Sequence, residues 1–109
     1  MAAAGLNLSD DLSKLSSLAE MNVCQTLRER LLLNRIYTAI GNILIAVNPC
    51  QQLADVYTEE VRQNYVDGSS SQLAPHVYHV GRQMYDGIAT GECQAVVISG
   101  NIGGAFASW

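Results

Sequence analysis

Basic residues are scarce in this chain. Only six of its 109 residues are Lys or Arg, against ten Asp or Glu, and the formal net charge at pH 7 is −4. Proteins that bind nucleic acid neutralise phosphates with clustered Lys and Arg. The sequence has no such cluster, so it argues against nucleic acid as the main partner.

Cysteine and long apolar runs are also scarce. Cys24, Cys50 and Cys93 are an odd number without a CxxC pair, so neither a disulfide framework nor a zinc site is indicated, and reduced cytoplasmic thiols are expected. The N-terminus has no basic segment followed by an apolar one, and the longest uninterrupted apolar run is Ile43 to Val47. We therefore expect neither a secretory signal nor a membrane span.

What the chain does have is a globular composition, with 49 % hydrophobic and 15 % charged residues, and one dense β-branched stretch, IYTAIGNILIAVNP. The stretch predicts a β-hairpin with arms at 36–40 and 43–47, joined by a turn at Gly41-Asn42. The second arm is apolar on both faces, which is typical of a central strand covered above and below. The hairpin then delivers a loop at Asn48-Pro49.

The residues before the hairpin predict an amphipathic helix. Asn22 is a suitable N-cap with Gln25 at the third helical position, and the helix is expected to end near Asn34. Residues 28–30 (Arg-Glu-Arg) are expected on its solvated side. Further upstream, leucines three or four residues apart fit either a short helix or an extended strap: Leu8, Leu12, Leu15 and Leu18.

Two more helices are predicted after the hairpin. Thr58 is a suitable N-cap for a short helix that runs to about Tyr65, and residues 67–71 have the composition of an exposed loop. The second helix is expected to carry Pro75 in its first turn and Gly91 at its C-terminal cap. Its apolar face has four members: Val77, Val80, Met84 and Ile88.

Two pairs on this second helix could suggest chemistry. His76 and His79 lack a nearby Cys, Asp or Glu at ligand spacing, so polar contacts at the helix start explain them better than a metal site. Tyr78 and Tyr85 are interpreted as packing residues rather than as a stacking platform. We attach no catalytic role to either pair.

The last motif is an apolar strand pattern, Ala95 to Ser99, that runs into Gly100. Strands that end in glycine often begin a phosphate-binding loop, which needs a Lys and then a Ser or Thr at the sixth and seventh positions after the first glycine. Here these positions hold Phe106 and Ala107. Neither side chain can neutralise phosphate or hold magnesium.

Taken in order, these features resemble the start of a myosin motor head. The resemblance rests on VCQTLRERLLLN, IYTAIGNILIAVNP, APHVYHVGRQMY and QAVVISG, and it covers about residues 10–100. It implies an α/β fold, a partial mixed sheet with flanking helices from the N-terminal part of a P-loop NTPase motor domain. We expect residues 1–9 to form a tail, 10–100 a fragment of the motor domain, and 101–109 a divergent tail.

The resemblance also implies a nucleotide site. Asn48, Pro49 and Tyr57 would lie on the adenine side of ATP, and Gly100 and Gly103 would remain from the family's phosphate loop, GESGAGKT. By family, the cofactors are ATP and Mg²⁺, the partner is the actin filament, and the location is the cytoplasm and its cytoskeleton. Three departures from the family pattern affect this site. The chain carries one residue more than the commonest family spacing between Pro49 and Tyr57, and Gln51 and Gln52 replace frequent basic residues. In the phosphate loop, Asn101, Ile102, Phe106 and Ala107 replace the family's glutamate, serine, lysine and threonine.

Three functions are therefore considered. The first is an actin-based motor ATPase, and the second is an inactive fragment of one that keeps part of the adenine pocket. The third is an independent small α/β protein that binds a phosphate-bearing ligand through Gly100, Gly103 and Gly104. For the chain as written we expect the inactive fragment, and the change to NIGGAFASW is what a truncated transcript, an unspliced intron or a faulty gene model would produce. The strands of such a fragment would lack neighbouring strands at their edges, so we expect the chain to fold marginally and to tend to aggregate.

Overall fold

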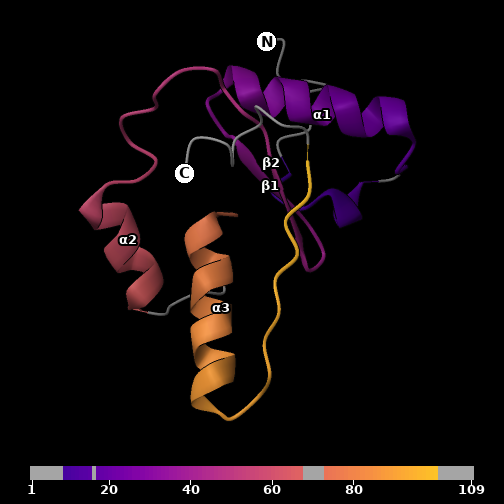
Figure 1. The fold of residues 1–109 in the computed structure, drawn as a ribbon. Coiled ribbons are helices and arrows are strands. Elements are labelled where there is room, and N and C mark those ends of the chain that lie inside the picture. The colour runs from indigo at the N-terminus through magenta and orange to yellow at the C-terminus, as the bar shows by residue number, and fades with distance from the viewer. Residues whose placement is uncertain (1–8, 16, 68–72, 101–109) are drawn as a thin grey trace. The chain divides into compact units, whose positions relative to one another are not determined.

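A computed structural model describes residues 9–15, 17–67 and 73–100, and it confirms an α/β fold (Figure 1). The chain forms two compact units, residues 1–52 and residues 53–109, which we describe separately. The first contains η1, α1, β1 and β2, and the second contains α2 and α3. Their bounds are η1 Leu12–Lys14, α1 Glu20–Leu32, β1 Tyr37–Ile40, β2 Ile43–Ala46, α2 Glu59–Val66 and α3 Val77–Ala89.

The predicted hairpin is confirmed. Strands β1 and β2 pair antiparallel, from Tyr37 opposite Ala46 to Ile40 opposite Ile43. Gly41 is the first of the two loop residues and has φ of 59°. A type II′ hairpin turn requires positive φ at that position, which glycine adopts without steric cost.

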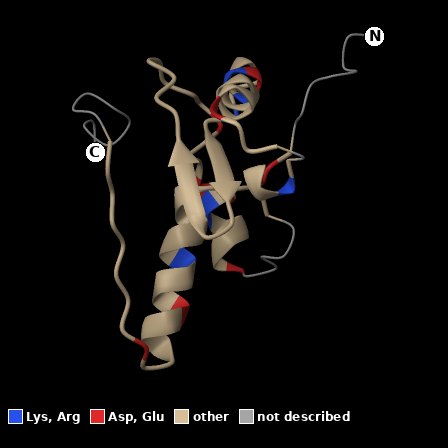
Figure 2. Cartoon of the chain, turned by 90° about the vertical axis from the view of Figure 1, so that its right-hand side faces the viewer, with Lys and Arg blue, Asp and Glu red and all other residues tan. Residues whose placement is uncertain are grey.

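The prediction that the second arm is a covered central strand is wrong for the described part of the chain. The only sheet there has two strands, and β2 pairs with β1 alone. Ile43 is 64 % exposed and the rest of β2 is half-buried. An apolar strand becomes central only when a neighbour pairs with each of its edges, and here one edge has none. Figure 2 shows that neither strand carries a charged residue.

Helix α1 begins earlier than predicted and ends near Asn34 as predicted. Its N-cap is Ala19, not Asn22, because the Ala19 carbonyl already accepts hydrogen bonds from the N–H groups of Asn22 and Val23. It stops at Leu32 because Asn34 takes a left-handed φ of 59°. Hydrogen bonds from Asn34 N to Leu31 O and from Arg35 N to Arg30 O complete a Schellman ending.

The prediction that Arg30 is solvated is wrong: it is only 1 % exposed. Its Nε donates to Thr38 Oγ1 (2.8 Å) and its Nη2 to the Tyr37 carbonyl (2.9 Å). Its Nη1 donates to the Ser9 carbonyl (3.1 Å) and to Asp10 Oδ1 (2.9 Å). The guanidinium is buried because these acceptors replace water, and it ties α1 to β1 and to the segment before η1.

The 3₁₀ helix η1 also contributes to the core of the first unit. Among the upstream leucines, Leu12 begins the short 3₁₀ helix η1 and is fully buried. Leu8 lies outside the described residues. Asp11 caps η1 by accepting from Ser13 N and Ser13 Oγ, and it also accepts from Gly41 N. These bonds, led by the Ser13 hydroxyl, lower the pKa of Asp11 below its ordinary value. A parallel bridge between Asp11 and Ala39 places η1 beside β1.

In the second unit, two of the predicted caps are confirmed. Thr58 Oγ1 accepts from Val61 N at the start of α2 (3.2 Å). At the end of α3, Gly91 has φ of 85° and donates to Ile88 O, while Glu92 N donates to Gly87 O. This is a Schellman ending with glycine at the left-handed position.

The start of α3 differs from the prediction. Pro75 lies before the helix rather than in its first turn, because His76 is extended (φ −161°) and serves as the N-cap. The face formed by Val77, Val80, Met84 and Ile88 is only half-buried and ends with an exposed Ile88. The predicted loop at 67–71 lies mostly outside the described residues.

The predicted strand Ala95 to Ser99 is wrong. No strand or helix is assigned to residues 92–100, and Val97 is 91 % exposed. A strand requires a hydrogen-bonded neighbour, and none pairs with this segment among the described residues. None of the described helices is long and apolar enough to cross a membrane.

Candidate functional site

In the first unit, the candidate residues are in the loop that follows β2. Val47 N donates to Ile36 O (2.9 Å), which extends the hairpin pairing to the edge of the loop. Asn48 Oδ1 then accepts from Cys50 N (2.8 Å), and Cys50 has a positive φ of 55°. Asparagine side chains form such local turns readily, so the Asn48-Pro49 loop has a defined shape.

In the second unit, Tyr57 is held by aromatic contacts. Its ring lies edge-on to His76, with centroids 5.5 Å apart and an interplanar angle of 78°, and edge-on to Tyr78 at 6.1 Å. The residue is still 46 % exposed. Tyr57 therefore presents part of an aromatic ring to solvent while other rings support it.

His76 is the buried member of this cluster. Its Nδ1 accepts from Tyr78 N (3.0 Å), and its Nε2 lies 2.8 Å from the Val56 carbonyl oxygen. Burial lowers the pKa of His76 below its ordinary value, while the hydrogen bond to Val56 opposes that effect. The expectation of polar contacts at the helix start is thus confirmed for His76.

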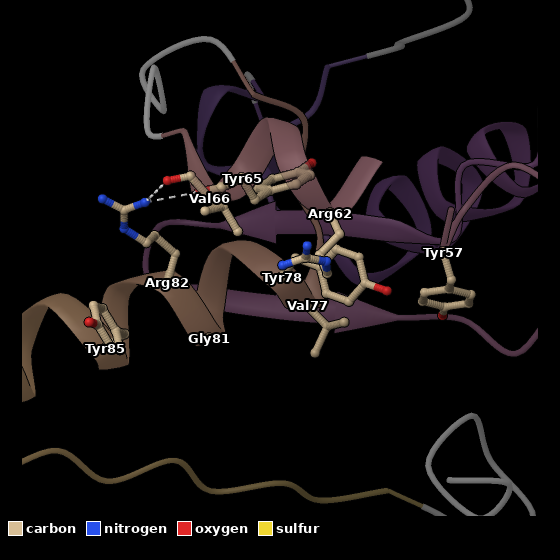
Figure 3. A pocket seen from close by; sticks show the side chains of 9 residues that line it. All are labelled: Tyr57, Arg62, Tyr65, Val66, Val77, Tyr78, Gly81, Arg82 and Tyr85. Atoms are coloured by element: carbon tan, nitrogen blue, oxygen red, sulfur yellow. Dashed lines mark hydrogen bonds between the residues drawn. The ribbon is translucent and has the colours of Figure 1, made fainter. Parts of the chain in front are cut away.

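A pocket of about 920 Å³ opens between α2 and α3 beside this cluster (Figure 3). Tyr65 is buried in its wall, and its hydroxyl donates to the Ala74 carbonyl (2.6 Å). The pocket is lined by Tyr57, Arg62, Tyr65, Val66, Val77, Tyr78, Gly81, Arg82 and Tyr85. Tyr78 packs as predicted, but Tyr85 is exposed, so its prediction as a packing residue is wrong.

Both arginines of the pocket are already paired. Arg62 bonds to Glu59 one turn earlier, which lowers the pKa of Glu59 and raises that of Arg62. Arg82 pairs with Asp86 (2.9 Å). It also donates to the Tyr65 and Val66 carbonyls at the end of α2, and the dashed lines of Figure 3 mark these two bonds. The pocket wall therefore carries four tyrosines, and each of its two arginines is paired with a carboxylate.

The predicted site residues fall in different parts of the chain. Asn48 and Pro49 belong to the first unit and Tyr57 to the second. Gly100 is exposed at the end of an extended segment, whereas Gly103 lies outside the described residues. Among the described residues, no group of three or more His, Cys, Asp or Glu side chains could hold a metal ion.

Sequence reasoning missed two structural residues. Arg30 was assigned to the surface because a charged triplet on a helix is usually solvated, yet it lies one turn from buried Thr26. Tyr65 received no role. The only signal for it was its position at the end of a short helix, where a ring can contact the next helix.

Comparison with known proteins places the chain in a family. The myosin head (motor domain) family matches residues 9–106, so the chain belongs to this family. Myosin-11 and Myosin-9 of Arabidopsis thaliana are each 42 % identical over 95 residues. Myosin IC heavy chain of Dictyostelium discoideum is 39 % identical over 95 residues. Each comparison covers 86 % of this chain but only 6 % of the two Arabidopsis proteins and 8 % of the Dictyostelium protein.

Proposed function

We propose that this chain supplies the adenine side of the nucleotide site of an actin-based myosin motor, and that the chain alone does not hydrolyse ATP. The observation that carries the proposal is the family match over residues 9–106, combined with the loss of the phosphate-loop lysine and threonine at Phe106 and Ala107. By family, the motor acts on actin filaments in the cytoplasm.

The adenine side of the site has suitable residues. Tyr57 offers a supported, partly exposed ring, and an aromatic ring or a proline can pack against a planar base. Asn48 would shape the loop that carries Pro49, since its side chain already closes the turn onto Cys50. These residues would bind and orient the base.

The triphosphate and magnesium side does not fit. ATP hydrolysis in this class depends on a lysine that neutralises the outer phosphates and on a hydroxyl that holds Mg²⁺. A phenylalanine and an alanine at 106 and 107 can supply neither. The arginines of the α2–α3 pocket already form ion pairs with Glu59 and Asp86, which a phosphate would have to displace.

The alternative is an independent small α/β protein that binds a phosphate-bearing ligand through Gly100, Gly103 and Gly104. Backbone N–H groups of glycines can hold a phosphate, but the binding is strong when a helix N-terminus adds its dipole. This function predicts that inorganic phosphate alone binds and that adenosine does not.

Titration of the purified 109-residue chain with ATP, adenosine and inorganic phosphate, each with and without Mg²⁺, would test the proposal. We expect weak binding of adenosine and ATP, no strengthening by Mg²⁺ and no hydrolysis. Tyr57→Ala should weaken this binding, whereas Ile88→Ala, which removes an exposed side chain of the same unit outside the pocket lining, should not.

Three results would contradict the proposal. Absence of adenosine binding would show that the chain does not keep the adenine side of the site. Magnesium-dependent, submillimolar ATP binding with measurable hydrolysis would show that the chain is an ATPase by itself. Binding of phosphate without adenosine would favour the independent phosphate-binding protein.

A further inference from the structure

One side chain fixes both the backbone and the ring of the loop that leads into α2. His76 bonds to the Val56 carbonyl, directly before Tyr57 in the chain, and it packs against the Tyr57 ring. It also packs against Tyr65 of α2, with centroids 5.3 Å apart. His76 is only 6 % exposed, so these contacts are made in the interior of the second unit.

The two hydrogen bonds of His76 define its protonation state. A carbonyl oxygen can only accept, so Nε2 must carry the proton that reaches Val56. A backbone N–H can only donate, so Nδ1 must keep a lone pair for Tyr78. Only the neutral imidazole with its proton on Nε2 makes both bonds at once.

From this geometry we propose that His76 is a positioning residue for Tyr57: the neutral imidazole holds the Tyr57 ring in place for the adenine base, and protonation of the imidazole releases it. This inference rests on the proposed nucleotide function for its last step. The positioning itself depends only on the contacts within the second unit.

Protonation acts through Nδ1. A proton there would face the N–H of Tyr78, so the helix cap would become a contact between two donors and the ring would have to move. Four groups that face the imidazole are the Val56 carbonyl and Tyr57 from the loop, Tyr65 from α2 and Tyr78 from α3, and none of these four is a carboxylate. The Val56 carbonyl and the Tyr57 ring would consequently lose their anchor.

The first test is an NMR titration of the full chain. The His76 ring resonances give its protonation midpoint, and amide relaxation gives the order parameters of Val56 and Tyr57 one pH unit above and below that midpoint. We expect rigid values of about 0.85 above it and values below about 0.6 beneath it. Order parameters that stay unchanged across the midpoint would overturn the proposal.

The second test separates positioning from helix capping. In His76→Asn, the amide oxygen can still cap α3 through Tyr78 N, since Asn is among the best N-cap residues, but it is too short to reach the Val56 carbonyl. We expect retained α3 helicity with a mobile Val56-Tyr57 segment at neutral pH. His79→Asn, on the same helix, is the matched control and should leave that segment rigid. A rigid segment in His76→Asn would overturn the proposal, and if this variant fails to fold, the titration of the natural chain decides.

The third test addresses the base. Adenosine should bind His76→Asn about two-fold to ten-fold more weakly than the natural chain, because a loosened side chain must be ordered on binding. Equal affinity in both proteins would overturn the link to the base. Absence of adenosine binding in the natural chain would instead refute the proposed nucleotide function, while the order parameters would still decide whether His76 positions Tyr57.

Discussion

The buried guanidinium of Arg30 ties α1 to β1 in the first unit, and replacing Arg30 with alanine should disrupt that unit. The substitution leaves three acceptors without their donor: Thr38 Oγ1 and the carbonyls of Tyr37 and Ser9. Each buried acceptor that loses its partner costs about 1–3 kcal/mol. The bond to Asp10 adds little, because that carboxylate is 54 % exposed.

We therefore expect Arg30→Ala to cost at least about 3 kcal/mol, since three acceptors lose their donor at about 1–3 kcal/mol each. A domain gains only about 0.05–0.15 kcal/mol of stability per residue, so a unit of 52 residues has little more than this to lose. The expected result is loss of the hairpin. Amide hydrogen exchange of Tyr37–Ile40, which lie in β1 beside the guanidinium, would measure it.

Three control variants make the reasoning refutable. Arg28→Ala removes an exposed arginine from the same helix and should change stability by less than about 0.5 kcal/mol. Asp10→Asn should cost at most about 1 kcal/mol. Arg30→Lys keeps the charge but loses the planar fork, so it should fall between Arg28→Ala and Arg30→Ala. If Arg30→Ala exchanges its β1 amides as slowly as Arg28→Ala, the network does not hold the unit together.

Three further predictions concern the second unit. Gly91→Ala should destabilise α3 by about 1–2 kcal/mol because Gly91 has a positive φ, whereas Gly81→Ala, in an open position within the same helix, should stabilise α3 by about 0.5–1 kcal/mol. Thermal unfolding followed by circular dichroism would compare the two variants, and equal shifts in their unfolding temperatures would refute the role of φ. Thr58→Ala should cost about 1 kcal/mol in denaturant unfolding through loss of the cap on α2, and Thr58→Ser should restore most of it. Since burial lowers the pKa of His76 below the unfolded value of about 6.5, its contribution to stability is present above that pH and is lost as pH falls through the folded pKa; a pH series of unfolding midpoints should show this decline, and His76→Asn should lack it.

Local signals predicted the elements that depend on local chemistry. The Gly41-Asn42 turn, the Thr58 cap and the Gly91 ending were all read correctly, since each requires a residue type at one position and a partner within a few residues. Helix boundaries were less accurate. Asn22 and Pro75 both fit a helix start by type, but the true starts were set by backbone bonds at Ala19 and by the His76 imidazole.

The candidate site was less predictable because its contacts join distant residues. Only the resemblance to the myosin head indicates Tyr57 as a site residue. Nothing in its local sequence indicates that the His76 ring, 19 positions later, packs against it. Arg30 shows the same limit. Its acceptors lie seven to twenty-one residues away, and the sequence pattern around it is that of a solvated helix face.

The failed strand at Ala95 to Ser99 shows what an apolar pattern does and does not encode. These residues can adopt the φ and ψ values of an extended chain by themselves, but the hydrogen bonds that define a strand must come from a neighbour. β1 and β2 have each other, supplied by a two-residue turn, and so they form from local sequence. Residues 95–99 have no such turn partner, and the extended segment leaves Val96, Val97 and Ile98 exposed. Exposed apolar side chains together with backbone N–H and C=O groups that make no ladder bonds favour pairing with another strand. Residues 95–99 would therefore form a strand only when a partner strand pairs with them.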